Sequence, residues 1–374
     1  MATAFRKFTK RIFITLNIFL AVLFLLACVN AYLPPEHWWF IAILGLSFPF
    51  LLLLVVFFFF FWLFFRSKWL FLSFGVLLIG FMNIRSLIGF NFATRYTPAK
   101  KEGVIRLLTW NVNRFTESRQ TNRLNPYTQD ILKIIKQQQP DVLCFQEFLE
   151  PDRTAGMSLI NNFEEQGYKY HYVVSDYSRR NGTYQVGVAI FSRHPILDSI
   201  RIQYQGPKAM RAAESLIACD IECNGKKIRV YNTHLQSIML QKKDYHDLEI
   251  IKNAQDSMVE ASKSIVRKLK QGYRFRDDQV EIVRTELDRS PYPEIICGDF
   301  NDVPNSYTYF RIKGSRKDAF VEKGRWFGRT YSNLSPTLRI DYVMTDEIFE
   351  ILQYKRLVQS YSEHYPIIVD VRLK

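Results

Sequence analysis

Cysteine and histidine are scarce in this sequence, and their spacing excludes a structural zinc site. The 374 residues include five cysteines and six histidines, without the repeated close spacing that zinc ligands require. Cys219 and Cys223 flank one strand-like segment, so they could pair only if that strand were broken. We therefore expect five free thiols. Internal repeats are also lacking, as are low-complexity tracts beyond the phenylalanine run at residues 57–61.

Acidic residues are also fewer than basic ones, which indicates the kind of partner that the chain can bind. Lys and Arg total 50 against 36 Asp and Glu, a formal charge of +14. Residues 1–91 contribute +6, from seven basic and one acidic residue, and the remainder contributes +8. This balance suits a phosphorylated substrate or an anionic membrane surface. The basic residues are scattered, whereas nucleic-acid binding favours a tract along the backbone path.

The first 90 residues are almost continuously apolar, unlike the rest of the chain. Three spans, at residues 12–33, 38–65 and 69–90, reach the roughly 20 residues that a membrane-crossing helix needs. We predict a membrane anchor over residues 1–91 with three transmembrane helices, a linker over 92–102 and a catalytic domain over 103–374.

Two other interpretations of the apolar spans stay open at this stage. One is a buried helical hairpin of a soluble protein, which these lengths disfavour. The other is a cleaved signal peptide, because basic residues precede the first span and residues 25–28, Leu-Leu-Ala-Cys, resemble a lipoprotein cleavage box.

Basic residues beside the spans predict the orientation of the chain. Four precede the first span and two, Arg66 and Lys68, separate the second from the third, whereas the loop between the first two spans has none. The positive-inside rule then places the N-terminus in the cytoplasm. We expect a multi-pass protein of the inner (cytoplasmic) membrane with its catalytic domain facing outside, in the periplasm.

The remaining sequence alternates apolar strand-like runs with helical patterns, which favours a layered α/β fold. Strands are expected at 104–110, 141–146, 185–191, 214–221, 227–233, 294–297, 339–344 and 367–373. Helices are expected at 126–138, at 244–271 with Gly272 as the stop, and at about 276–288.

Short polar segments begin or end these strands, and they carry the chemistry. They cover residues 109–113, 146–147, 232–234, 298–302, 339–342 and 362–364. Strand ends that meet at one edge of a sheet commonly form a site. The side chains gathered there are carboxylates, carboxamides and imidazoles. Such an oxygen-rich set suits Mg²⁺, with Mn²⁺ as an alternative ion.

These segments resemble, in their order along the chain, the motifs of the endonuclease/exonuclease/phosphatase (DNase I-like) superfamily, here in a membrane-anchored bacterial form. The resemblance spans about residues 104–373. It implies a four-layer sandwich of two packed mixed β-sheets flanked by helices, here preceded by about three transmembrane helices. It also implies metal-dependent phosphoester hydrolysis.

The same resemblance implies a role for each matching residue. Glu147 is the expected principal metal ligand, with Asn111 binding metal and phosphate and Asp341 supporting the metal or the histidine. Catalytic or water-positioning roles are implied for His234, Asp299, Asn301 and His364, and Asn301 is also expected to bind the substrate phosphate. Arg211, from its place before a strand, is either a phosphate clamp or one half of a surface ion pair.

Residue 363 departs from the family pattern. The superfamily usually has Ser-Asp-His where this sequence has Ser362-Glu363-His364. We expect Glu363 still to act as the carboxylate partner of a site histidine, reaching the same point by bending back.

The sequence thus predicts a membrane-anchored, Mg²⁺-dependent phosphoester hydrolase that acts on a phospholipid or sphingolipid headgroup or on nucleic acid. The alternative is a catalytically weak or inactive membrane receptor or scaffold that retains the fold. No obligate protein partner is inferred.

Overall fold

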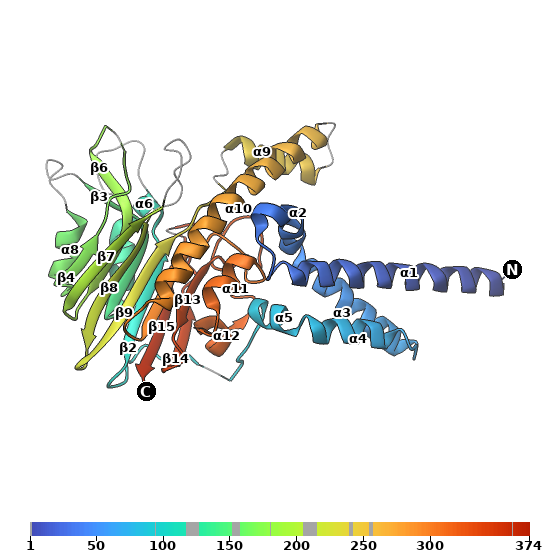
Figure 1. Cartoon of the computed structure of the whole chain (residues 1–374), viewed down its shortest axis with the longest axis horizontal. Helices are drawn as coiled ribbons and strands as arrows, with labels where there is room; N and C mark the ends of the chain where they lie inside the picture. Colours follow the sequence, from blue (N-terminus) through green and yellow to red (C-terminus); the bar gives the residue numbers. More distant parts are fainter. Residues whose placement is uncertain are drawn as a thin grey trace.

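The structure is a computed structural model in which helices at the N-terminus project from a two-sheet body (Figure 1). It describes residues 2–93, 95–116, 127–151, 158–179, 181–204, 215–238, 242–253, 257–360 and 362–374. The N-terminal helices are α1 (Ala2–Val29), α2 (Pro35–Leu46), α3 (Phe48–Phe64), α4 (Leu70–Ile79) and α5 (Phe81–Leu87), of which α2 lies beside α10 (Met258–Asp288).

One of these helices is long and apolar enough to cross a membrane by itself. It runs over Phe5–Val29 within α1. The second and third predicted spans are each a bent pair instead, α2–α3 at 53° and α4–α5 at 67°, and the total reaches three only if each pair is one span. The third also ends earlier than predicted, because α5 stops at Leu87 and Gly89–Phe90 forms strand β1.

The bend between α2 and α3 follows from the sequence and from packing. Pro49 stands in the first turn of α3 and has no backbone N–H, so it cannot continue the hydrogen bonds of α2. On the N-terminal side of the bend, Ala42 of α2 packs against Leu269 and Tyr273 of the long helix α10.

Two sheets form the body. The first has the strand order β14 (Phe349–Arg356), β15 (Ile367–Leu373), β2 (Ile105–Asn111), β3 (Val142–Pro151), β6 (Tyr184–Ser192) and β4 (Tyr170–Val173), with β5 (Tyr177–Arg179) also on β6. The second has the order β11 (Lys317–Asp318), β13 (Asp341–Thr345), β10 (Glu294–Asp299), β9 (Lys226–His234), β8 (Ser215–Cys223) and β7 (Ile196–Gln203). A third pair joins β1 to β12 (Arg325–Trp326).

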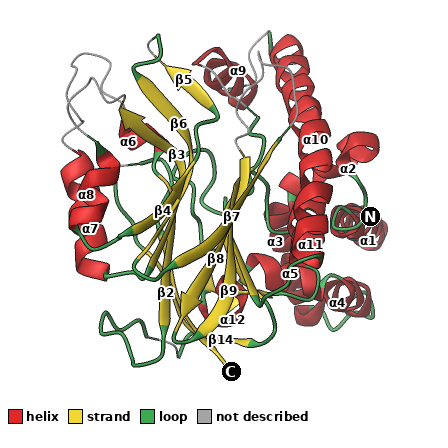
Figure 2. Ribbon diagram, turned by 60° about the vertical axis from the view of Figure 1, so that its left-hand side comes forward, coloured by secondary structure: helices red, strands yellow, loops and turns green. Residues whose placement is uncertain are grey.

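The two sheets lie face to face between helices (Figure 2). Residues of β2 are buried on both faces: Ile105 and Leu107 face the core between the sheets, and Leu108 and Trp110 face the helices outside. The outer helices are α7 (Tyr127–Gln138) and α8 (Leu159–Glu165) on the first sheet, and α10 and α11 (Tyr307–Lys313) on the second. The predicted layered α/β fold is confirmed.

Helix α10 corrects one prediction. Gly272 was expected to end a helix, but α10 continues through it to Asp288, preceded by α9 (Lys242–Lys252). Gly272 is buried in the helix beside Ile238, so packing overrides the modest cost of glycine in a helix. All five cysteines are buried and free, as expected.

Buried polar contacts join the N-terminal helices to the body. Asn30 donates to the carbonyl of Asn305 at 3.3 Å, and Asn305 donates to that of Gly45 at 3.0 Å. Arg339, which is 1% exposed, donates to the carbonyl of Ser86 at 2.6 Å. Because unpaired buried polar groups are costly, these contacts favour one fixed placement of the helices.

Candidate active site

The predicted polar segments meet at one end of the sandwich because of the strand directions. Parallel neighbours β2 and β3 run to this end together, as do β9 and β10. Strand β13 begins there, with Asp341 opposite Asp299. The side chains gathered at this end, termed the strand-end cluster, are Asn111, Glu147, His234, Asp299, Asn301, Asp341 and His364.

Two carboxamides between the sheets hold this end together. Gln146 donates to the side chain of Asn232 at 2.6 Å, and Asn232 donates to the carbonyl of Phe145 at 2.9 Å. Both residues are fully buried. These bonds connect β3 with β9. Glu147 and His234, which come soon after Gln146 and Asn232 in the chain, therefore lie at the same end of the sandwich.

Glu147 projects from an irregularity in β3. The pairing of β3 with β6 shifts between Phe145 and Phe148, and Glu147 adopts a φ of +50°. Its carboxylate lies 3.4 Å from the guanidinium of Arg114. Burial alone would raise the pKa of Glu147, but Arg114 and the two histidines of the cluster outweigh it and lower that pKa. The charged form is therefore favoured.

Asp299 lies at the centre of the cluster. Its Oδ2 accepts a hydrogen bond from Asn111 Nδ2 at 3.1 Å, and its Oδ1 accepts one from the backbone of Asn301 at 2.9 Å. Gly298 allows the close strand packing beneath it, since a Cβ there would lie 1.9 Å from the carbonyl oxygen of Thr233. Burial and the carboxylate of Asp341 raise the pKa of Asp299, against the lowering effect of the two histidines.

Both histidines face Asp299 through Nε2, at 3.6 Å for His234 and 3.7 Å for His364. His364 also places Nδ1 3.0 Å from Asp341 Oδ2, which fixes the ring. Burial lowers the pKa of His364, but Asp341 and Asp299 outweigh it and raise that pKa to about 9.

The loop of His364 is tied to the same strand end. Ser362 Oγ donates to the carbonyl of Asn111 at 2.9 Å and accepts from the backbone of His364 at 3.1 Å. Trp110 Nε1 donates to the carbonyl of His364 at 2.9 Å. The ring position is thus determined by β2 as well as by Asp341.

One predicted residue, Glu363, is not part of the strand-end cluster, and another cannot be placed. Arg211 lies outside the described residues. Glu363 is exposed, and its carboxylate accepts a hydrogen bond from the Tyr331 hydroxyl at 3.2 Å. The carboxylate that contacts His364 Nδ1 is Asp341, so Glu363 is not the partner of that histidine. His364 and Glu363 are neighbours in the chain whose side chains point to different sides, one buried and one exposed.

Arg114 was missed in the sequence. It stands one residue beyond the first polar segment, where Asn113 and Arg114 both take a positive φ within the short turn α6 (Asn113–Thr116). Its position after a strand end was the available signal. Its contact with Glu147 depends on that turn, which a local pattern does not reveal.

The cluster fits a hard divalent cation. Donor atoms of Asp299, Asp341 and His364 lie within 4.8 Å of one another, and all three residues are buried. Glu147 and Asn111 adjoin them, with Asn111 Nδ2 within 3.4 Å of the Glu147 carboxylate. A cation would relieve the repulsion between the buried carboxylates Asp299 and Asp341. The Asn111 oxygen, on the other side of the amide, accepts the backbone N–H of Asn113 at 3.0 Å.

Comparisons with known proteins agree with this fold. The sequence model of the Endonuclease/Exonuclease/phosphatase family matches residues 108–360, more than half of the chain. That range contains every member of the strand-end cluster except His364. A second model, described as a domain of unknown function (DUF8431), matches residues 10–87. No curated protein matches the chain.

Two solved structures share the fold. An endonuclease/exonuclease/phosphatase from Beutenbergia cavernae is 17% identical with a TM-score of 0.53, covering 73% of this chain and 72% of its own. The human Nocturnin catalytic domain, solved with a bound sulfate anion, is also 17% identical with a TM-score of 0.51, covering 73% of this chain and 95% of its own.

Proposed function

The chain belongs to the endonuclease/exonuclease/phosphatase family, and from that membership we propose that it is a divalent-metal-dependent phosphoester hydrolase held at a membrane. Residues 1–91 would serve as the anchor and residues 103–374 as the catalytic domain. The observation that carries the proposal is the strand-end cluster, where three carboxylates and two histidines meet at one end of the sandwich.

Mg²⁺ is the expected ion, with Mn²⁺ as a substitute, held by Glu147, Asn111 and Asp341. When bound, it would neutralise charge on the phosphate oxygens and polarise the leaving group. Asp299 and Asn301 would orient the attacking water, because the backbone of Asn301 already donates to Asp299. His364 would use Nε2, which lies 3.7 Å from Asp299, to exchange a proton with the substrate, since its Nδ1 is held by Asp341.

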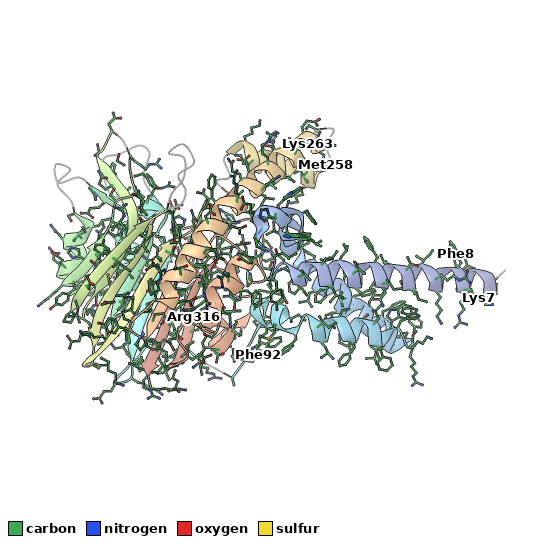
Figure 3. All side chains as sticks on the ribbon, in the orientation of Figure 1. Lys7, Phe8, Phe92, Met258, Lys263 and Arg316 are labelled. Atoms are coloured by element: carbon green, nitrogen blue, oxygen red, sulfur yellow. The ribbon has the colours of Figure 1, made fainter. Side chains whose placement is uncertain are left out.

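A phosphodiester of a lipid headgroup is the substrate class that the arrangement favours. The loops of the site are tied to the N-terminal helices through Asn305 and Arg339. Helix α10 packs on α2 and carries exposed Met258 and Lys263 at the end labelled in Figure 3. Between residues 258 and 274 this helix has five basic residues and one acidic residue, which suits an anionic surface. Nucleic acid is the competing substrate class.

Full-length protein in lipid nanodiscs tests the proposal. We expect hydrolysis of bis-p-nitrophenyl phosphate in Mg²⁺ or Mn²⁺, and its loss in excess chelator. A panel of sphingomyelin, phosphatidylcholine, inositol phosphates, DNA and RNA then identifies the substrate class. Full activity in chelator contradicts the metal mechanism. A metal-loaded protein inactive on every substrate supports the receptor or scaffold alternative.

A reporter fused to Lys374 tests the orientation. One crossing or three places the body opposite the N-terminus, and the six basic residues flanking the predicted inner side favour a cytoplasmic N-terminus. Lys7 and Phe8 lie at the end of α1 away from the sheets (Figure 3). Alkaline phosphatase at Lys374 should be active and a cytoplasmic fluorescent reporter dark. The opposite pattern requires an even number of crossings.

A further inference from the structure

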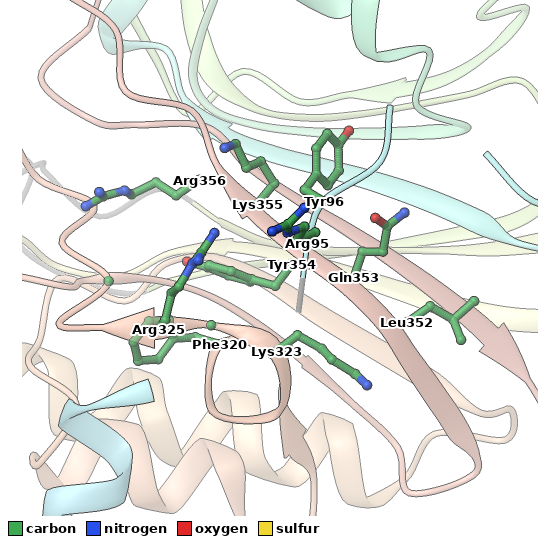
Figure 4. A pocket seen from close by; sticks show the side chains of 12 residues that line it. Arg95, Tyr96, Phe320, Lys323, Arg325, Leu352, Gln353, Tyr354, Lys355 and Arg356 are labelled. Carbon is green, nitrogen blue, oxygen red and sulfur yellow. The ribbon is translucent and has the colours of Figure 1, made fainter. Parts of the chain in front are cut away.

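A cavity of about 470 Å³ lies between β14 and α12 (Ala319–Lys323), outside the strand-end cluster (Figure 4). Twelve residues line it, and none is acidic. Five are cationic, and they define what we term the basic pocket: Arg95, Lys323, Arg325, Lys355 and Arg356. So many like charges around one cavity repel each other unless an anion is present.

Four of these five cations lie apart from the carboxylates of the described residues. Within the described part of the chain, no carboxylate lies within 4.0 Å of the charged groups of Arg95, Arg325, Lys355 or Arg356. Lys355 lies over the ring of Tyr96 at 6.0 Å, and Arg356 lies over Tyr365 at 5.4 Å. Arg356 also donates to the carbonyl of Arg329. Aromatic faces and carbonyls position these cations without neutralising them.

Tyr354 also lines the cavity. Its oxygen is buried and has no hydrogen-bond partner among the described residues. Burial raises the pKa of Tyr354 well above its usual value, so the hydroxyl keeps its proton. The donors that the cavity offers are three guanidinium and two ammonium groups, which are the groups that bind phosphate oxygens.

The basic pocket lies where the chain leaves the N-terminal helices. Strand β1 directly follows α5 and pairs with β12, which contains Arg325. Asn91 donates to the carbonyl of Gly324, which also lines the pocket. This connection holds one wall of the pocket against the last N-terminal helix.

Exposed aromatic side chains surround that connection. Phe90, Phe92 and Trp326 are 54%, 51% and 65% exposed. The ring centroids of Phe92 and Trp326 lie 5.2 Å apart. Tryptophan and tyrosine concentrate at the level of lipid headgroups at the ends of membrane-crossing helices, a position that suits Trp326. An aromatic surface beside a basic cavity therefore matches an interface that carries phosphate.

We infer that the basic pocket is a second, non-catalytic site that binds a phosphate group, with the headgroup of an anionic phospholipid as its source. Occupation would hold the body in one orientation on the membrane. The lipid source rests on the membrane attachment in the proposed function, whereas the anion chemistry rests on the pocket alone. Free inorganic phosphate is the other source of the same chemistry.

Binding to detergent-solubilised full-length protein in excess chelator tests this site, because the chelator suppresses metal-dependent hydrolysis. The probes are dihexanoyl phosphatidic acid, dihexanoyl phosphatidylcholine and inorganic phosphate, measured by calorimetry. The pocket variant is Arg325→Gln with Lys355→Gln, which leaves Arg356 intact because it lies beside Tyr365. The matched control, Lys133→Gln with Lys226→Gln, removes two exposed positive charges elsewhere.

We expect phosphatidic acid to bind and phosphatidylcholine not to bind, with affinity for phosphatidic acid reduced at least tenfold in the pocket variant and unchanged in the control. Equal binding of inorganic phosphate and phosphatidic acid would support the site with free phosphate as its source. Absence of binding, or equal binding by the pocket variant, overturns the inference. Hydrolysis of bis-p-nitrophenyl phosphate in Mg²⁺ is measured separately, so failure of the proposed function is distinguishable.

Discussion

Replacing Glu147 with glutamine is expected to lower kcat by about 10³-fold or more, since a bound cation contributes several kcal/mol to a phosphoester transition state. Glutamine has nearly the same shape and can keep the irregular backbone of β3, where φ at this position is +50°. It removes the negative charge that faces Arg114 at 3.4 Å and the predicted metal. The loss should therefore come from metal binding and not from unfolding.

Thermal unfolding with and without Mn²⁺ separates these two causes. Wild-type protein should gain stability from the ion, and Glu147→Gln should lose most of that gain while its metal-free melting temperature stays close to the wild type. Glu222→Gln is the matched control, because this exposed carboxylate lies at the end of β8 away from the site. Wild-type turnover in Glu147→Gln would contradict the assigned ligand.

The strand-end cluster could be predicted largely from local pattern. Asn111, His234 and Asp299 each end an apolar strand, and strands that run in parallel end on the same side of a sheet. Once the strand directions are known, these residues are expected to lie at the same end of the fold. The family resemblance supplied those directions.

Features that depend on distant parts of the chain could not be predicted this way. The shift at Glu147 arises from pairing with β6, some 40 residues further along the chain. Likewise, α10 passes through Gly272 because it packs between the body and α2, which comes from the N-terminal helices. In both cases tertiary packing outweighs a local preference.

Glu363 shows that neighbours in the sequence need not be neighbours in the site. Glu363 was expected to partner a site histidine, but adjacent residues rarely share a direction in a non-helical segment, and Glu363 does not reach His364. The buried partner, Asp341, comes from the start of β13 and is 23 residues away in sequence. Only the antiparallel placement of β13 beside β10 brings it to the cluster.

Asp341→Asn and Glu363→Gln should therefore differ sharply, although each removes one negative charge near His364. We expect Asp341→Asn to lower kcat by about 10²-fold or more, the usual scale for lost acid–base assistance. Glu363→Gln should stay within about twofold of the wild type, because rim charges in water contribute little. Steady-state hydrolysis of bis-p-nitrophenyl phosphate in saturating Mg²⁺ measures both.

The pH profile distinguishes loss of ring orientation from a general loss of structure. Asp341 is the largest influence that raises the pKa of His364 to about 9, so the asparagine variant should lower that pKa. If protonated His364 assists the leaving group, the alkaline limb of the kcat profile moves to lower pH in Asp341→Asn and stays in place in Glu363→Gln. An equal loss in both variants, or a shifted limb in Glu363→Gln alone, would return the catalytic partnership to Glu363 and leave Asp341 as a metal ligand only.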